Sequence, residues 1–374
     1  MTRPDIALTR YFADLPDPRI DRTKKHALGD ILVITVCAVI CGADTFEEVE
    51  RFGRAKYDWL RRFLELPNGI PSHDTFNRVF AALDPRQFGD CFARWMAALC
   101  TATGLRQVAV DGKVVRRAPR DTFSGCLHLV SAWATENRLI LGQQAVADGS
   151  HEIAAIPELL RVLDLAGALV TIDAAGCQVE IARQVREQGG HYLLTVKGNQ
   201  PTLHDALRAL LERALDDDFA GLRHDTHEAT EEGHGRREWR CVSVIYDPPG
   251  LPPDWADVAA AVLVTRERRV GEQDGWESHC YLTSLAGTAE ELGGYIRSHW
   301  DIENGLHWVL DVAFREGANR TRAGHAGANL GLVRRVAASL LSQDGARGSI
   351  KVKRFNAALD ESYLLRVLQG FTEN

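Results

Sequence analysis

The sequence predicts an α/β protein in which a mixed sheet is flanked by helices and preceded by a helical N-terminal part. Residues 27–100 carry apolar side chains at helical spacing, and β-rich segments begin after residue 105. Beyond a run of three such segments, strands alternate with helices, which is typical of a mixed sheet. The 374 residues, 45% hydrophobic and 25% charged, indicate two or three folded domains and exclude a fully disordered or fibrous chain.

Three further observations restrict the class of protein. The longest apolar run, residues 31–43, is shorter than the roughly 20 residues that a membrane span needs, so we expect a buried segment and no membrane partner. Residues 1–22 have no apolar core, so we expect no signal peptide. The eight cysteines include no Cys-x-x-Cys pair and indicate reduced thiols, as in a cytoplasmic protein.

Residues 1–102 are expected to form a helical domain. Residues 46–63 have helical periodicity, and Ser72 is a plausible N-cap for a helix that ends before Asp84. Two helices joined by a short Gly/Pro turn fit either a DNA-binding helix-turn-helix or a plain helical bundle cap. The sequence does not separate these two alternatives.

Residues 103–341 are expected to form the α/β domain. Three strands in a meander come first, followed by alternating helices and strands: 108–115, 128–135, 138–147, helix 152–165, strand 168–173, helix 177–188 and strand 191–197. A β insertion at about 215–286 follows an acidic stretch, with three strands expected in 223–283. The chain is then helical over 290–341 and ends in a basic segment, 342–374.

Three carboxylates have informative positions in this pattern. Asp111 and Asp173 each follow a short strand, where the sheet passes into a loop, and Glu303 lies in an aromatic-rich helical segment. Two Asp from neighbouring strands and one Glu from a packed helix can converge on one or two Mg²⁺ ions, which prefer hard oxygen ligands. Such ions promote in-line displacement at phosphorus. A single Asp after a strand, however, is more often a turn or capping residue.

Five ordered motifs carry a resemblance to a known family: VAVDGKVVRRA, TIDAAGCQ, YLLTVKGNQP, HGRREWR and YIRSHWDIENGLHWVLDVAF. With LELPNGIPSHDTFNRVF and DESYLLRVL, they span nearly the whole chain. In this set the chain resembles the DDE-type bacterial insertion-sequence transposases, and most closely the ISAs family with its H-repeat-associated proteins.

The resemblance implies an RNase H-like catalytic core interrupted by the β insertion, with Asp111, Asp173 and Glu303 as catalytic and metal-binding residues. It implies Mg²⁺ as cofactor, with Mn²⁺ as a substitute, and no small-molecule cofactor. The partners would be double-stranded DNA at the transposon ends and the target, bound by a homodimer in a bacterial cytoplasm, on the nucleoid. The activity would be metal-dependent DNA strand cleavage followed by strand transfer.

Cations near these carboxylates are candidate DNA contacts, although each is also explained by a solvated surface. The basic and polar residues of this set are Lys113, Arg116, Arg117, Lys197, Arg236, Arg240, Arg297, His299, Asn304 and His307. The histidines could instead orient Glu303. On a regular helix His299, Glu303 and His307 would share one face, which leaves a zinc site as a minor alternative. We expect Trp300 and Trp308 to be core residues.

Two positions depart from the family pattern. Gly149 stands where Lys is expected, and Gly317 stands where an acid is expected. They leave open an alternative function, a catalytically silent or decayed transposase-derived DNA-binding protein. The presence of all three carboxylates favours the enzyme.

The net charge of −7 opposes a DNA partner at first sight. Residues 212–232, however, hold eight acids and two bases, so this acidic segment accounts for six of the seven negative charges. We expect the acidic segment to face away from DNA, and the basic segments 113–120 and 315–335 to line it.

Overall fold

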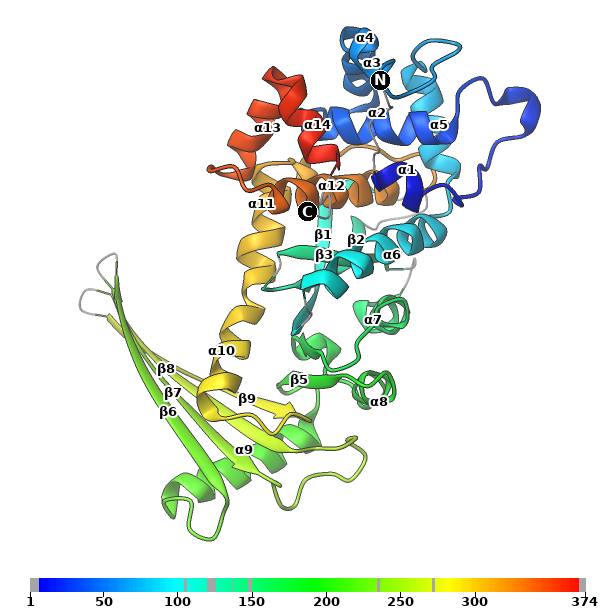
Figure 1. Cartoon of the computed structure of the whole chain (residues 1–374). Helices are drawn as coiled ribbons and strands as arrows, with labels where there is room; N and C mark the ends of the chain where they lie inside the picture. The colour runs from blue at the N-terminus through cyan, green and yellow to red at the C-terminus, as the bar shows by residue number, and fades with distance from the viewer. Residues whose placement is uncertain are drawn as a thin grey trace. The chain divides into compact units, whose positions relative to one another are not determined.

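The computed structural model describes residues 7–103, 106–119, 126–136, 138–146, 150–233, 236–270 and 273–369. It confirms a mixed α/β protein with a large mixed sheet flanked by helices (Figure 1). The chain divides into two compact units, and each is described by itself. The first contains residues 1–104, 112–163 and 303–374, and the second contains 105–111 and 164–302.

The first unit is mainly helical. Its N-terminal helices are α1 (Ala7–Tyr11), α2 (Leu28–Ile40), α3 (Phe46–Ala55), α4 (Tyr57–Leu60), α5 (His73–Ala82) and α6 (Pro85–Thr103), with a 3₁₀ turn, η1 (Asp21–Thr23). The strands and helix that follow are the second part of β1 (Gln107–Pro119), β2 (Cys126–Ala134), β3 (Leu139–Ala145) and α7 (Glu152–Arg161). The C-terminal elements are η3 (Ile302–His307), α11 (Trp308–Val312), η4 (Glu316–Ala318), α12 (Ala326–Gln343), α13 (Ile350–Leu359) and α14 (Glu361–Gln369).

Helix α12 forms the centre of the first unit. Its residues 326–341 are all buried, and it packs against β2 and β3 as well as α2, α5 and α6. Helix α2 is the apolar run expected to be buried, and residues 30–40 are buried as predicted. Among the described residues no helix is long and apolar enough to cross a membrane.

The predicted helix after Ser72 is α5, which packs against α3 and α12. Phe76, Val79 and Phe80 are buried, while His73 and Arg78 remain exposed. Ser72 takes the N-cap position, but its hydroxyl lies 3.1 Å from that of Thr75 and makes no cap to the backbone. A helix-turn-helix and a bundle cap share this arrangement, so both alternatives stay predictions.

The second unit contains the first residues of β1, then β4 (Leu169–Ile172), η2 (Ala174–Gly176), α8 (Val179–Glu187), β5 (His191–Val196), α9 (Pro201–Asp216), β6 (His224–Gly233), β7 (Arg236–Tyr246), β8 (Ala260–Val270), β9 (Gln273–Thr283) and α10 (Ala289–His299). The strand order is β1-β4-β5-β9-β8-β7-β6, and the first unit has β3-β2-β1. The pairs β1/β4 and β4/β5 are parallel, whereas β6 to β9 form an antiparallel ribbon joined to β5 (Figure 1). Helix α10 packs its Leu292 and Ile296 into the apolar core of this ribbon.

The β insertion has four strands, not the three expected. The additional strand, β6, occupies the second half of the acidic segment 212–232, which we had placed before the insertion. Its side chains are polar on both faces, so it lacks the alternation that predicts a strand. It pairs with β7 along its whole length as the edge strand, where charged residues are common because they discourage pairing with other chains.

A buried ion pair joins α12 to η4, and a hydrogen bond from the same arginine joins α12 to β2. Arg335 and Glu316 are both 0% exposed and lie 2.7 Å apart, and Arg335 also donates to the hydroxyl of Ser131 in β2. Removal of one partner leaves the other charge buried without compensation.

We therefore expect Glu316→Gln to lower the free energy of unfolding by about 3–5 kcal/mol, measured by thermal and urea unfolding. Glu212→Gln is the matched control, because it breaks the exposed Arg208–Glu212 pair and should change stability by less than about 1 kcal/mol. Equal stability of the two variants would contradict a structural role for the buried pair.

Candidate active site

The parallel pairing of two strands brings two of the three carboxylates to the same end of the strand pair. Val110 of β1 is registered with Ile172 of β4, so Asp111 and Asp173 are the next residues on adjacent strands. The carboxyl ends of parallel strands are a common place for ligands in open α/β sheets. The register therefore places Asp111 next to Asp173, but β1 continues to Pro119, so Asp111 lies within a strand and not at the start of a loop as expected.

The backbone fixes the direction of the Asp173 carboxylate. Its Oδ1 accepts hydrogen bonds from the backbone N–H of Ala175 at 3.0 Å and of Gly176 at 3.4 Å, in the turn η2. The side chain of Asn199 donates to the carbonyl of Ala174 at 2.7 Å and holds the same turn. The Thr-Ile-Asp-Ala-Ala-Gly motif thus caps a 3₁₀ turn through the predicted catalytic Asp.

A buried polar network fixes α10 against the strands that carry these acids. The amide of Gln107 donates to Thr171 Oγ1 at 3.2 Å and to the carbonyl of Tyr295 at 2.9 Å, and accepts from Ser298. Thr171 Oγ1 lies 2.9 Å from Nδ1 of His299. Sequence reasoning missed Gln107 and Thr171, because a polar residue inside a strand has no distinct pattern.

His299 is a neutral part of this network. Burial lowers its pKa to about 4, although the nearby charge of Asp173 opposes the shift. It bonds to Thr171 within the fold, which favours a role in positioning α10 over a contact with DNA.

Glu303 belongs to the first unit, four residues after His299 in the chain. It is exposed in η3, a π-helical turn over Ile302–His307, and Asn304 beside it is also exposed. Such turns occur often at functional sites. The π turn breaks the regular spacing on which the zinc alternative depended, and among the described residues no group of three or more His, Cys, Asp or Glu is placed to hold a metal ion.

The same turn changes the neighbours of Glu303. His307 is half-buried, and burial lowers its pKa to about 3, with the charges of Arg335 and Lys113 acting in the same direction. A neutral, largely enclosed imidazole is unsuited to binding a DNA phosphate, which corrects that expectation. Trp300 and Trp308 are 51% and 57% exposed, so the expectation that they are core residues was wrong.

Lys113 does not face solvent. It is 8% exposed, and its Nζ lies 2.5 Å from Oδ2 of Asp311 in α11. Asp311 also adjoins Gly317, where a Cβ would lie 3.2 Å from its Oδ1, so an acid at 317 would crowd a second negative charge against it. The structure corrects the expectation that Lys113 is an exposed DNA contact.

The residue after Asp111 has no room for a side chain. A Cβ on Gly112 would overlap the carboxylate of Glu152 and lie 2.9 Å from Nε2 of His128. Oε1 of Glu152 lies 2.5 Å from Nε2 of His128, and this pair covers the backbone at Gly112, next to Asp111. We had not singled out either residue.

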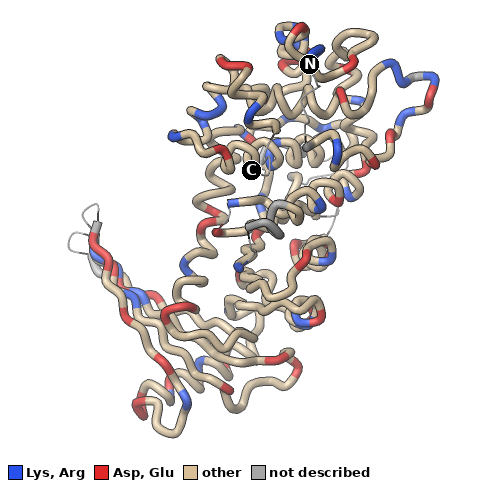
Figure 2. The backbone as a smooth tube through the Cα atoms, in the orientation of Figure 1, with Lys and Arg blue, Asp and Glu red and all other residues tan. Residues whose placement is uncertain are grey.

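The remaining cations differ in their availability. Lys197 is exposed just after β5, while Arg297 forms a bidentate pair with Glu231 and Arg240 pairs with Glu238. Figure 2 shows acidic and basic residues intermixed along β6 to β9. The side chains of Arg116, Arg117 and Arg236, and residues His234 and Gly149, lie outside the described residues. The half-burial and pairing of Arg240 disfavour it as a free DNA contact.

The chain shares its sequence pattern with transposases. Residues 102–340 match the transposase DDE domain, and residues 9–96 match the domain associated with it, DDE_Tnp_1-associated. The chain therefore belongs to the DDE-type transposases, and its relatives place it among the insertion-sequence transposases of the H-repeat-associated type.

Two relatives from Escherichia coli cover almost the whole chain. "Putative transposase YncI" of strain O157:H7 is 36% identical over 98% of this chain and 95% of its own. "H repeat-associated putative transposase YhhI" of strain K12 is 35% identical over 97% of this chain and 98% of its own. "Uncharacterized protein in dhlA 3'region" of Xanthobacter autotrophicus is 45% identical over 73% of this chain and 93% of its own.

The histidines allow a direct check of the site. In an NMR titration of the imidazoles, we expect the ring of His299 to stay neutral until the pH falls to about 4, because burial disfavours its charge. The exposed His73, whose pKa Glu50 raises, should instead titrate above its ordinary value. His299→Gln assigns the resonance, and titration of His299 near 6.5 would show that the network around Thr171 does not enclose it.

Proposed function

We propose that this transposase cleaves DNA at the ends of its element and joins those ends to target DNA, with Asp111, Asp173 and Glu303 as the catalytic carboxylates. The register of β1 with β4 carries the proposal, because it sets Asp111 beside Asp173. Glu303 is included in the catalytic set because of its position in the family motif and its exposure in the π turn.

The donor set fits a divalent metal of the family's usual kind. Carboxylate oxygens suit Mg²⁺ and Mn²⁺, and the backbone bonds to Oδ1 of Asp173 hold that side chain in one direction. We propose that Asp111, Asp173 and Glu303 hold Mg²⁺, or Mn²⁺ in its place. When bound, the metal makes water nucleophilic at neutral pH and stabilises charge on the phosphate.

The reaction has two steps that share one geometry. Water attacks a phosphodiester at the element end, the bond to the 3′ oxygen breaks, and a 3′-OH is released. That 3′-OH then attacks a phosphodiester of the target in line, which forms one ester bond as another breaks. The chain itself supplies position: η2 orients Asp173, and Gln107, Thr171 and His299 hold α10, which leads into Glu303.

DNA contacts are proposed at exposed residues next to these acids, Lys197 and Asn304. Arg297 joins them if the DNA displaces Glu231, and Arg116, Arg117 and Arg236 remain candidates. We further propose that residues 1–102 assist DNA recognition, that 103–341 with its insertion form the catalytic domain, that 342–374 form the C-terminal segment, and that a homodimer assembles on two ends.

The test is cleavage of a duplex that carries the DNA flanking the coding frame, with Mg²⁺ and purified protein. Asp111→Asn, Asp173→Asn and Glu303→Gln should each lower the rate by about 100-fold or more, because each removes several kcal/mol of transition-state stabilisation. Glu180→Gln is the matched control, since Glu180 is an exposed acid on α8 paired only with Arg183 among the described residues.

Full cleavage by Asp173→Asn would contradict the assignment of the triad. If the wild type binds the duplex but does not cleave it with Mg²⁺ or Mn²⁺, the chain is a silent DNA-binding relative and the proposed activity is wrong.

A further inference from the structure

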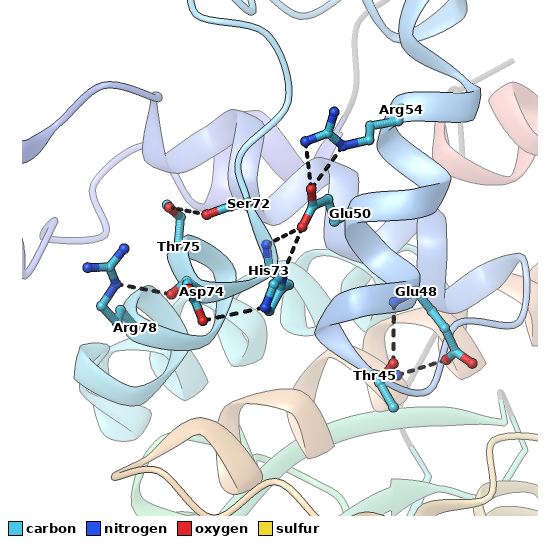
Figure 3. Close-up of polar contacts among 9 residues, drawn as sticks. All are labelled: Thr45, Glu48, Glu50, Arg54, Ser72, His73, Asp74, Thr75 and Arg78. Atoms are coloured by element: carbon cyan, nitrogen blue, oxygen red, sulfur yellow. Dashed lines mark hydrogen bonds and ion pairs between the residues drawn. The ribbon is translucent and has the colours of Figure 1, made fainter.

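The first unit has a polar pocket that the proposed chemistry does not use. Its volume is about 700 Å³, and four segments line it: residues 44–48, the first half of α5, residues 315–323, and α12 through Arg334. Figure 3 shows three of the lining residues: Thr45 and Glu48, which form the capping box of α3, and His73, which bonds to Glu50. Four arginines line the pocket: Arg315, Arg320, Arg322 and Arg334.

The floor of the pocket contains a buried cation with unused donors. Arg334 is 1% exposed, and its Nε and one terminal nitrogen have no hydrogen-bond partner. Its other terminal nitrogen makes a long bond, 3.4 Å, to the carbonyl of Asp44. Burial lowers the pKa of Arg334, opposed by Glu316 and Asp44, but a guanidinium stays charged in proteins.

A second buried donor lies in the same pocket. Asn319 is 6% exposed, and its Nδ2 has no partner, while its Oδ1 accepts from the backbone N–H of Thr321 at 3.0 Å. Buried donors are normally satisfied, because an unmade hydrogen bond costs about 1–3 kcal/mol. Two unsatisfied donors from different segments, facing one pocket, indicate a ligand that accepts hydrogen bonds.

The rim adds positive charge. Arg315, Arg320 and Arg322 are exposed, and only Arg315 has a described partner, Asp44 at 3.4 Å. Three acids also line the pocket: Asp44, which pairs with Arg315, and the exposed Glu47 and Glu48. The carboxylate of Glu48 accepts from the backbone N–H groups of Asp44 and Thr45 in the capping box. Four arginines against three acids leave the lining with a net charge of +1.

We propose that this arginine pocket binds a phosphodiester group of the DNA backbone, with Arg334 and Asn319 donating from the floor and Arg320 and Arg322 from the rim. Guanidinium groups bind phosphate oxygens through paired, charge-assisted hydrogen bonds, which would satisfy the unused donors. The choice of DNA as the source of the phosphate rests on the proposed function. The pocket assigns a role to part of the basic segment 315–335, although Arg335 is buried in its ion pair and takes no part.

The experiment measures DNA binding by fluorescence anisotropy in EDTA, so that no cleavage occurs. The probes are a fluorescein-labelled duplex that carries the DNA flanking the coding frame and an unrelated duplex of equal length. Arg320→Ala/Arg322→Ala should weaken binding to both duplexes by about tenfold or more, because side chains that bind phosphates carry no base information. The salt dependence of binding should also become less steep, by about one for each phosphate that the variant no longer neutralises.

The matched control is Arg347→Ala/Lys351→Ala, which removes two exposed cations of the same unit outside the pocket and outside residues 1–102. It should bind DNA as the wild type does. Arg334→Lys keeps the positive charge but loses the planar guanidinium with its paired donors, and should also bind DNA more weakly. Thermal unfolding shows whether each variant is folded.

Several outcomes would overturn the proposal. One is equal affinity of the wild type and the Arg320/Arg322 variant, and another is an equal loss in the control. A third is a pocket that takes only free phosphate: inorganic phosphate would raise the melting temperature of the wild type and not of the variant, while both bind DNA alike. Failure of the proposed catalysis is distinguishable, because Asp173→Asn should bind DNA normally in EDTA whether or not the wild type cleaves.

Discussion

The parallel pairing of β1 with β4 is the constraint on which the candidate site depends. Because Val110 and Ile172 are registered, each is followed by an aspartate at the point where the parallel pairing of β1 with β4 ends. A shift of one residue in this register would separate the two acids and turn one to the opposite face. The turn η2 and the Gln107–Thr171–His299 network then hold the surroundings of this edge in place.

Burial determines which cations of the basic segments are available to a ligand. The basic segments 113–120 and 315–335 suggested that cations next to the acids would face DNA. Instead, Lys113, Arg335, Lys353 and Arg354 are buried in ion pairs or backbone hydrogen bonds. A buried charge without a partner is costly, so each of these side chains ties its own segment to the segment that supplies its partner. The exposed arginines Arg315, Arg320 and Arg322 remain available to a polyanionic partner.

The sequence was sufficient to predict the strands that carry the first two carboxylates and the strand that follows them. Strands β1, β4 and β5 lie within a few residues of their predicted bounds, and the placement of Asp111 and Asp173 follows from them. Strand β6 was missed because both its faces are polar. Trp308 was misplaced because regular helical spacing does not foresee the π turn at Ile302–His307 that precedes it. Trp300 was misplaced because α10 ends at His299, just before it. Buried arginines such as Arg334 look like surface residues until packing is known.

Metal binding tests the central claim most directly, because it does not depend on DNA or turnover. Crystals soaked in Mn²⁺ should show an anomalous difference peak at the carboxylates of Asp111 and Asp173, and electron paramagnetic resonance should show bound Mn²⁺ in solution. Asp173→Asn should abolish both signals, while Glu180→Gln should leave them unchanged. Mn²⁺ that binds Asp173→Asn as tightly as the wild type would contradict the account.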